Sequence, residues 1–481
     1  MRMSRHVEPG RLTLFEQFVA VAWLPASQLT VYSNRANYVA LALLMAAVFY
    51  RIVLFPMGSP ARFSDRLRSS SRHGQWLLLV WTFFGISHIA LQMRGFGYYW
   101  GLKEVVISLA WLTVLPTYFY TSLQTLNTTH TIRLLRLTSF GLLVIVGINF
   151  LGYYINIQTE SQIEGFVGGN SKMMALFGIS FNRIIFPFGA GVNGYGVVVA
   201  LALVVAYYIY RIPSMFSKAV AMLVAAACFF SLAAADSRAA LAAALLVIVI
   251  WKFFPQLLSS RMTGLFVLLS LLGPPLLTTL PEILPASIVE MISRSNRPAN
   301  MAEMLTTGRV LFWQGVYDDL INHPFNLIFG YGPYSQAVSD AGTEVGRLFG
   351  RGGAVGQFTF HSTSAQIAMD SGVFGIIAFY ALALTVANAL SSVLRRNEVL
   401  ENTSKLEVCR LLMSMFLVLM LTGATESIAT IYLRDSMIIF VTISAVASCA
   451  YLLWPAPPYL SPRSKSALSH DFAKSRAHIN A

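Results

Sequence analysis

The chain has 481 residues, of which 56% are hydrophobic and only 11% charged. A soluble globular protein is usually about a quarter charged, so this composition excludes that class and indicates a membrane protein. The net charge of +13 does not indicate nucleic-acid binding, because the basic residues are scattered along loops and form no recognised binding motif.

Apolar segments close to the roughly 20 residues that cross a bilayer recur along the whole chain. We therefore expect an all-α polytopic membrane protein with about twelve transmembrane helices in one bundle. The first segment carries Glu16, which leaves open whether it crosses fully. The expected spans are residues 13–31, 37–57, 75–93, 101–120, 135–156, 184–210, 216–234, 238–255, 263–280, 363–392, 409–425 and 436–454.

The distribution of Lys and Arg favours an orientation with both termini in the cytoplasm. Residues 1–280 then hold the first nine spans, and 281–360 form the one long outward loop. Residues 361–455 hold the last three spans, and 456–481 form a disordered cytoplasmic tail.

Many basic residues still fall on the outer side, and most of them are arginines. The planar guanidinium can hold a phosphate by two hydrogen bonds, so this excess indicates an anionic ligand on the outer face. The alternative is that they are loop residues or interface anchors. These arginines are Arg35, Arg94, Arg183, Arg238, Arg294, Arg297, Arg309, Arg347, Arg351 and Arg434.

The long outward loop contains one clear amphipathic segment, "TTGRVLFWQGVYDDLINHP" at 306–324. Its spacing predicts a helix at about 308–323, with Thr307 as a possible cap and Pro324 at its end. We expect this helix at the outer membrane surface or over the bundle. The apolar face comprises Val310, Trp313, Val316, Tyr317, Leu320 and Ile321.

His361 lies at the outer end of the tenth span, where an imidazole of ordinary pKa, about 6.5, can accept a proton at neutral pH. A capping or packing role is the alternative. Asp370 follows nine residues later, about 13 Å deeper by helix rise. An intramembrane carboxylate is a functional candidate, although nearby serines could instead satisfy it.

Arg183, Arg238 and Arg309 lie near the outer ends of three other segments. They could bind a pyrophosphate together if the bundle brings those ends close. The structural alternatives are that Arg238 pairs with Asp236 and that Arg183 extends to the interface. No nucleotide- or metal-binding motif is present, so we expect neither a cofactor nor a metal.

Four segments resemble the O-antigen ligase and polymerase superfamily of bacterial envelope glycosyltransferases. His361, Ser362, Gly372 and Gly375 match its pattern of His, a small polar residue, nine variable positions and Gly-x-x-Gly. The other three are "TGRVLFWQGVYDDLINHPFNLIFGYGPYS", "ADSRAALAAALL" and "RIIFPFGAGVNGYG". In the third of these segments, Val192 precedes Asn193 at a position where the superfamily commonly has a proline. The resemblance covers about residues 180–392.

This resemblance implies a GT-C-like bundle in the bacterial inner membrane. Such proteins transfer a glycan from undecaprenyl pyrophosphate to an acceptor hydroxyl, on a sugar or on lipid A core, at the periplasmic face. His361 would be the base, and Arg183, Arg238 and Arg309 would bind the pyrophosphate. Asn193, Arg297, Arg351 and Asp370 are further candidate site residues.

The motifs leave several functions open. The His-Ser pair is closest to the ligases, which attach finished polymer to lipid A core, but polymerases of the same superfamily share the plan. A transporter of lipid-linked sugar is a further alternative, although no internal repeat is visible. A cell-wall polymerase fits less well, because that family relies on an outward aspartate.

Overall fold

The computed structural model describes residues 10–29, 35–54, 72–95, 101–157, 171–175, 178–189, 191–283, 309–333, 335–343, 359–428 and 435–454. The long helices are α1 (Leu14–Gln28), α2 (Arg35–Leu54), α4 (Arg72–Gln92), α5 (Leu102–Thr125), α6 (Thr128–Tyr154), α9 (Gly191–Tyr210), α10 (Met215–Ala234), α11 (Arg238–Phe253), α13 (Thr263–Ile283), α20 (Thr363–Leu394), α22 (Thr403–Gly423) and α23 (Asp435–Leu453). The shorter ones are η2 (Met93–Gly95), α8 (Lys172–Ala175), α12 (Pro255–Leu258), α16 (Arg309–Asn322), α17 (Pro324–Phe329), α18 (Ser335–Val338) and α21 (Asn397–Leu400).

Each expected span coincides with one of the long helices. Among the described residues, eight helices are long and apolar enough to cross a membrane. The α9 and α13 helices contribute shorter apolar stretches, and α1 and α11 have 15 and 16 residues. The all-helical, multi-pass architecture is therefore confirmed, whereas the number of twelve crossings stays a prediction.

Glu16, the charged residue within the first expected span, forms an ion pair in the structure. Glu16 completes a capping box with Thr13 at the start of α1, and its carboxylate accepts a hydrogen bond from the Arg51 guanidinium of α2. Both side chains are almost fully buried. Pairing reduces the cost of burying a carboxylate among apolar helices, so Glu16 joins α1 to α2.

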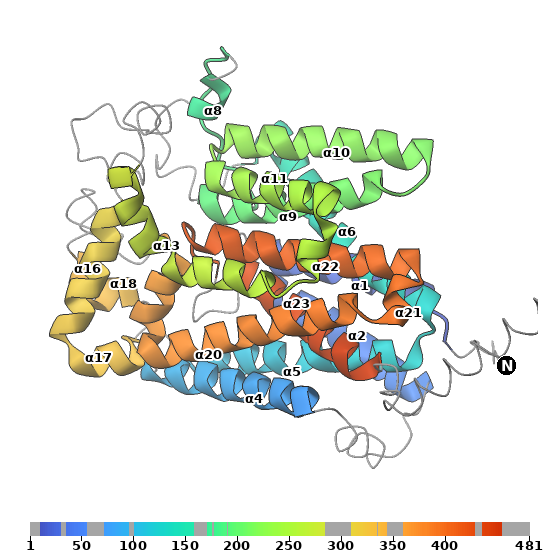
Figure 1. Cartoon of the computed structure of the whole chain (residues 1–481), viewed down its shortest axis with the longest axis horizontal. Helices are drawn as coiled ribbons and strands as arrows, with labels where there is room; N and C mark the ends of the chain where they lie inside the picture. The colour runs from blue at the N-terminus through green and yellow to red at the C-terminus, as the bar shows by residue number, and fades with distance from the viewer. Residues whose placement is uncertain are drawn as a thin grey trace, which may run out of the picture.

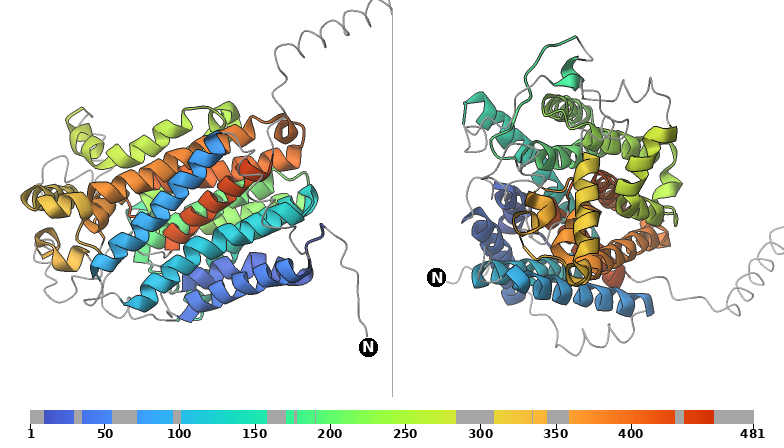
Figure 2. Two further views of the ribbon diagram at one scale, coloured as in Figure 1. Left: turned by 90° about the horizontal axis from the view of Figure 1, so that it is seen from below. Right: turned by 90° about the vertical axis from the view of Figure 1, so that its left-hand side faces the viewer.

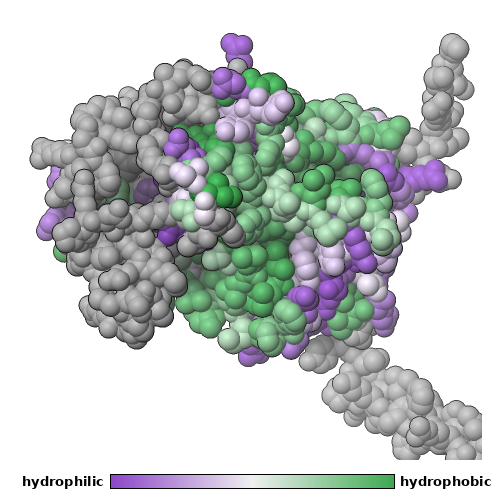
Figure 3. Space-filling model, turned by 90° about the horizontal axis from the view of Figure 1, so that it is seen from above, coloured by the Kyte–Doolittle hydropathy of each residue, from purple (hydrophilic) through white to green (hydrophobic). Residues whose placement is uncertain are grey.

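The long helices lie side by side, and α16, α17 and α18 gather at one end of the bundle (Figure 1, left). Figure 2 shows this end face-on in its right-hand view. The α22 helix is central, packing against α9, α11, α13 and α20. Its first half carries Glu407, which pairs with Arg211, and its far end leads to Glu426. Hydrophobic side chains dominate the face between the two ends (Figure 3).

The predicted helix of the outward loop is present as α16, and it lies over the end of the bundle. Its buried residues pack with Phe360 and Met369 at the start of α20. The predicted apolar face was partly wrong. Tyr317 and Ile321 are exposed, whereas Phe312 is buried, because the contact with α20 lies to one side of the expected stripe.

Two glycines lock α17 against α20. Gly372 interrupts α20 with a φ of 62°, and a Cβ there would collide with the backbone of Ile328. Gly330, with a φ of 68°, approaches the α20 backbone in the same way. The Tyr331 amide donates to the Met369 carbonyl at 2.7 Å across this contact. The first glycine of the Gly-x-x-Gly pattern therefore anchors the loop helices to the bundle.

Replacing Gly372 with alanine is expected to lower thermal stability in detergent. A φ of 62° with a ψ of −163° is a conformation that is essentially confined to glycine and costs other residues about 1–3 kcal/mol, and the collision with Ile328 adds to this. Gly85→Ala is the matched control, because a Cβ at Gly85 in α4 meets no atom within 4 Å. Equal melting temperatures for the two variants would contradict the proposed lock.

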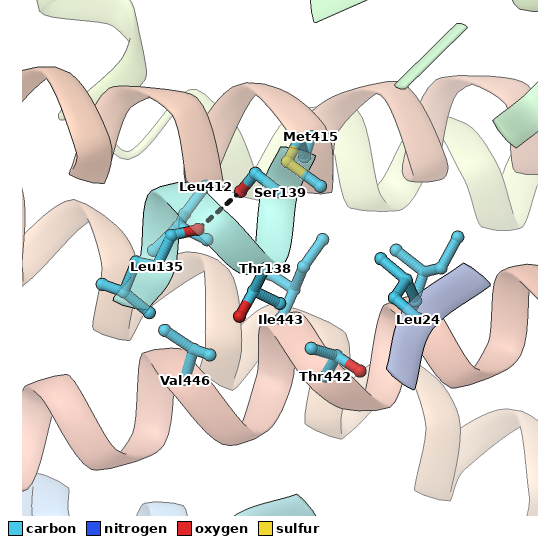
Figure 4. A pocket seen from close by; sticks show the side chains of 10 residues that line it. Leu24, Leu135, Thr138, Ser139, Leu412, Met415, Thr442, Ile443 and Val446 are labelled. Atoms are coloured by element: carbon cyan, nitrogen blue, oxygen red, sulfur yellow. Dashed lines mark hydrogen bonds between the residues drawn. The ribbon is translucent and has the colours of Figure 1, made fainter. Parts of the chain in front are cut away.

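A small pocket lies inside the bundle, between α1, α6, α22 and α23 (Figure 4). Its lining is apolar apart from hydroxyl groups, and the Ser139 hydroxyl donates to the Leu135 carbonyl of its own helix at 3.0 Å. With no charged group in its lining, this pocket has the character of a packing gap and offers no groups for catalysis.

Candidate active site

His361 occupies the turn that leads into α20, at the end of the bundle covered by α16. Its backbone has a φ of 50°, the left-handed conformation. Its Nδ1 lies 3.6 Å from Oε2 of Glu426, and its ring packs edge-on against Phe312 of α16 at 5.5 Å. The side chain is 26% exposed, so the imidazole is held on one side and accessible on the other.

Glu426 follows the C-terminal end of α22 and links His361 to Arg309. The Arg309 guanidinium donates to Oε1 of Glu426 at 2.7 Å, and the carboxylate is largely buried. Thr363, the first residue of α20, donates its hydroxyl to the Glu426 carbonyl at 3.0 Å. The same hydroxyl accepts from the Ile428 amide at 3.1 Å. The start of α20 therefore fixes both His361 and the loop that carries Glu426.

The electrostatics of Glu426 favour the ionised carboxylate. Burial alone would raise its pKa, but the nearby Arg309 charge and the contact with His361 act in the opposite direction. Together they hold the pKa of Glu426 below its ordinary value of 4.5. The group is thus an anion at neutral pH, able to attract the imidazole N–H of His361.

This lowered pKa predicts a specific acid sensitivity. Its contribution to folding stability is complete above pH 4.5 and is lost as the pH falls through the lower folded-state pKa. We expect wild type to melt above Glu426→Gln at pH 7, and the difference to shrink below pH 4.5. Melting temperatures of both proteins from neutral to acidic pH provide the test, and a difference that stays constant would contradict the assignment.

Arg183 and Arg238 approach this site from two further segments. Arg238 begins α11 and pairs with Asp236, which has a φ of 56°, at 3.2 Å. Arg183 donates to the Ala235 carbonyl at 3.3 Å. Burial lowers the pKa of Arg183, and the charges of Arg238 and Arg309 lower it further. The hydrogen bond to Ala235 and the ion pair with Asp236 thus bring the segments of Arg183 and Arg238 together.

The charges of this cluster are unbalanced. Among the described residues, Arg238 pairs with Asp236 and Arg309 pairs with Glu426, and Arg183 adds a third positive charge. The Nε of Arg183 is buried and has no hydrogen-bond partner among the described residues. A buried donor of this kind costs free energy unless a ligand or water accepts from it. The cluster, which we call the arginine cluster (Arg183, Arg238 and Arg309), is suited to an anion.

Of the four remaining candidates from the sequence, the structure describes the side chain of Asp370. The Asp370 carboxylate is fully buried and accepts hydrogen bonds from Ser335 at 2.6 Å and Gln366 at 3.0 Å. The structure places the backbone of Asn193 in the first turn of α9 and does not describe its side chain. Arg297 and Arg351 lie outside the described residues.

Glu426 is the site residue that sequence reasoning missed. The available signal was its position directly after the eleventh span, on the same predicted side as His361 and the arginines. That position did not reveal its partners, because the contacts depend on how α20 and α22 pack together. A carboxylate next to a candidate base is nevertheless a pattern worth searching for at the outer ends of spans.

A second polar group, Asp319, His323 and Asp340, lies beside the loop helices, with ligand-type atoms within 4.8 Å of one another. Asp319 accepts hydrogen bonds from the Tyr331 hydroxyl at 2.6 Å and the Ala341 amide at 3.0 Å. Its contacts with the imidazole raise the pKa of His323. These contacts join α16 to the segments that follow it, which is a structural role.

One protein-family model matches part of the chain. Residues 221–380 match a family model described as O-Antigen ligase. A search of curated proteins found no match. The matched range includes Arg238, Arg309 and His361, whereas Arg183 and Glu426 lie outside it. The family resemblance read from the sequence is thereby confirmed. Over residues 221–380, the chain is similar to the O-antigen ligase family, which supports a membrane protein of polysaccharide biosynthesis.

Proposed function

We propose that the chain transfers a glycan from undecaprenyl pyrophosphate to an acceptor hydroxyl at the periplasmic face of the inner membrane, as an O-antigen ligase. The observation that carries this proposal is the meeting of His361, Glu426 and Arg309 at one end of the bundle. A base, a carboxylate that can orient it and a cation for the leaving group are the parts that such a transfer needs.

His361 would remove the proton from the acceptor hydroxyl. With Nδ1–H directed at Glu426, the lone pair of Nε2 is available to the acceptor. The acceptor oxygen then attacks the anomeric carbon while the bond from that carbon to the pyrophosphate oxygen breaks. The pyrophosphate leaves with the electron pair, and the proton stays on His361. Attack from the side opposite the pyrophosphate inverts the anomeric centre.

The arginine cluster would stabilise the departing pyrophosphate. Arg309 shares Glu426 with His361, so one carboxylate positions both the base and a leaving-group cation. The unpartnered Nε of Arg183 is a further donor for a phosphate oxygen. Because lipid pyrophosphate is already an activated leaving group, this chemistry requires no nucleotide sugar.

Arg238→Lys and Arg309→Lys are each expected to lower the transfer rate by roughly tenfold or more. Lysine retains the charge but cannot form the two parallel hydrogen bonds of a guanidinium. The measurement is the release of undecaprenyl pyrophosphate by purified, reconstituted protein. Arg211→Lys serves as the control, because Arg211 pairs with Glu407 toward the opposite end of the bundle. Wild-type rates for both cluster variants would remove the arginine cluster from the mechanism.

The glycan profile of a deletion strain tests the ligase assignment. We expect lipid A core without polymer, together with polymer that remains on its lipid carrier. A polymerase of the same superfamily would instead leave lipid A core carrying single repeats. An unchanged profile would contradict both functions.

A further inference from the structure

The backbone of His361 needs support from its surroundings. Its φ of 50° is sparsely populated by residues other than glycine, and such conformations persist only where neighbouring contacts hold them. Ser362, the N-cap residue of α20, forms no side-chain capping hydrogen bond. The contacts that hold the His361 turn must therefore come from other residues.

Gln366 brackets this turn from the first part of α20. Its side-chain Oε1 accepts a hydrogen bond from the Phe360 amide at 3.1 Å. Its own backbone amide donates to the Ser362 carbonyl at 2.9 Å. The backbone bond is the first i→i−4 bond of α20, so the contact specific to the glutamine side chain is the one to Phe360. The Phe360 carbonyl in turn accepts from Nε1 of Trp313 at 3.0 Å, which ties the turn to α16.

Asp370 holds the other end of the Gln366 side-chain amide. Nε2 of Gln366 donates to Oδ1 of Asp370 at 3.0 Å, one turn further along α20. A backbone N–H can only donate, so the side-chain oxygen of Gln366 must face Phe360, which leaves its NH2 group to donate to the Asp370 oxygen. Asp370 is fully buried and is itself held by the Ser335 hydroxyl at 2.6 Å.

We propose that Gln366 and Asp370 are positioning residues for His361. Asp370 orients Gln366, and Gln366 holds the turn in the left-handed conformation that places the imidazole between Glu426 and Phe312. The proposal rests on the proposed function of His361 as the base. It also gives the buried carboxylate of Asp370 a role in catalysis that involves no contact with substrate.

Steady-state kinetics of Gln366→Leu test the positioning role. We expect kcat to fall about 100-fold with KM within about twofold of wild type, since a displacement of about 1 Å at a catalytic group can cost this much. Asp370→Asn, which keeps the size of the side chain, should lower kcat less. Ser364→Ala is the matched control. This substitution removes the buried Ser364 hydroxyl, which forms a hydrogen bond with the Ser362 hydroxyl in the same region. The variant should retain kcat within twofold of wild type.

A double-mutant cycle separates positioning from general damage. If Gln366 acts through His361, adding Gln366→Leu to His361→Ala should not reduce the residual rate further. A loss that persists in full in the His361→Ala background would overturn the proposal. Wild-type kcat in both Gln366→Leu and Asp370→Asn would overturn it as well.

A spectroscopic measurement keeps this test independent of the transfer assay. The NMR signal of the His361 ring, assigned by its absence in His361→Ala, reports its contact with Phe312. We expect the signal to move in Gln366→Leu or Asp370→Asn and to stay in place in Ser364→Ala. If wild type showed no transfer, the proposed function would fail while this readout still tested the positioning. A signal unmoved in both variants would refute the positioning itself.

Discussion

His361→Ala is expected to lower the rate of glycan transfer by about 100- to 10,000-fold, the usual contribution of a positioned general base. The variant should still insert and fold, because the imidazole of His361 is partly exposed. Its removal leaves the Glu426 carboxylate paired with Arg309. Steady-state assays with reconstituted protein measure the loss, and added imidazole should restore part of the rate.

His323→Ala is the matched control for this prediction. His323 also belongs to the segment around the loop helices, but it pairs with Asp319. Its removal should leave transfer within about twofold of wild type. Full activity of His361→Ala, or an equal loss in His323→Ala, would exclude His361 as the specific base.

Glu426→Gln is expected to cost about two to three orders of magnitude in kcat. The amide matches the carboxylate in size but lacks the charge that favours an imidazole N–H at Nδ1 and neutralises Arg309. The loss should appear in kcat more than in KM, because Glu426 touches the base and the arginine, not the acceptor. The comparison of both constants with wild type provides the test.

Glu407→Gln provides the control at the opposite end of the same helix. Glu407 pairs with Arg211 and Arg410 near the start of α22, so its replacement changes an ion pair without touching the candidate site. We expect near-normal transfer. Comparable losses in the two variants would show that Glu426 acts through general stability of α22.

The sequence predicted the helices of the bundle well, because long apolar segments in a membrane protein leave helix as the favoured structure. It could not predict which face of α16 packs inward. Tyr317 and Ile321 continue the apolar stripe of α16, but the position of the α20 turn decides which neighbours are buried. Such choices depend on tertiary packing, which hydrophobic spacing does not encode.

The candidate site was predicted in part. His361 and Arg309 stood out by residue type and by their place at the outer ends of segments, and the structure brings them to one carboxylate. Glu426 itself was missed, because its partners come from segments more than 60 residues earlier in the chain. Asp370 was expected near substrate, and its structural partner Ser335 comes from a loop helix that spacing alone could not place.

The most direct test measures donor cleavage and acceptor glycosylation together, with purified protein in liposomes that carry a lipid-pyrophosphate-linked glycan. We expect one released undecaprenyl pyrophosphate for each glycosylated acceptor in wild type, and neither product above background in His361→Ala. Movement of the intact lipid-linked glycan across the bilayer without any release of undecaprenyl pyrophosphate would contradict the account and identify a transporter.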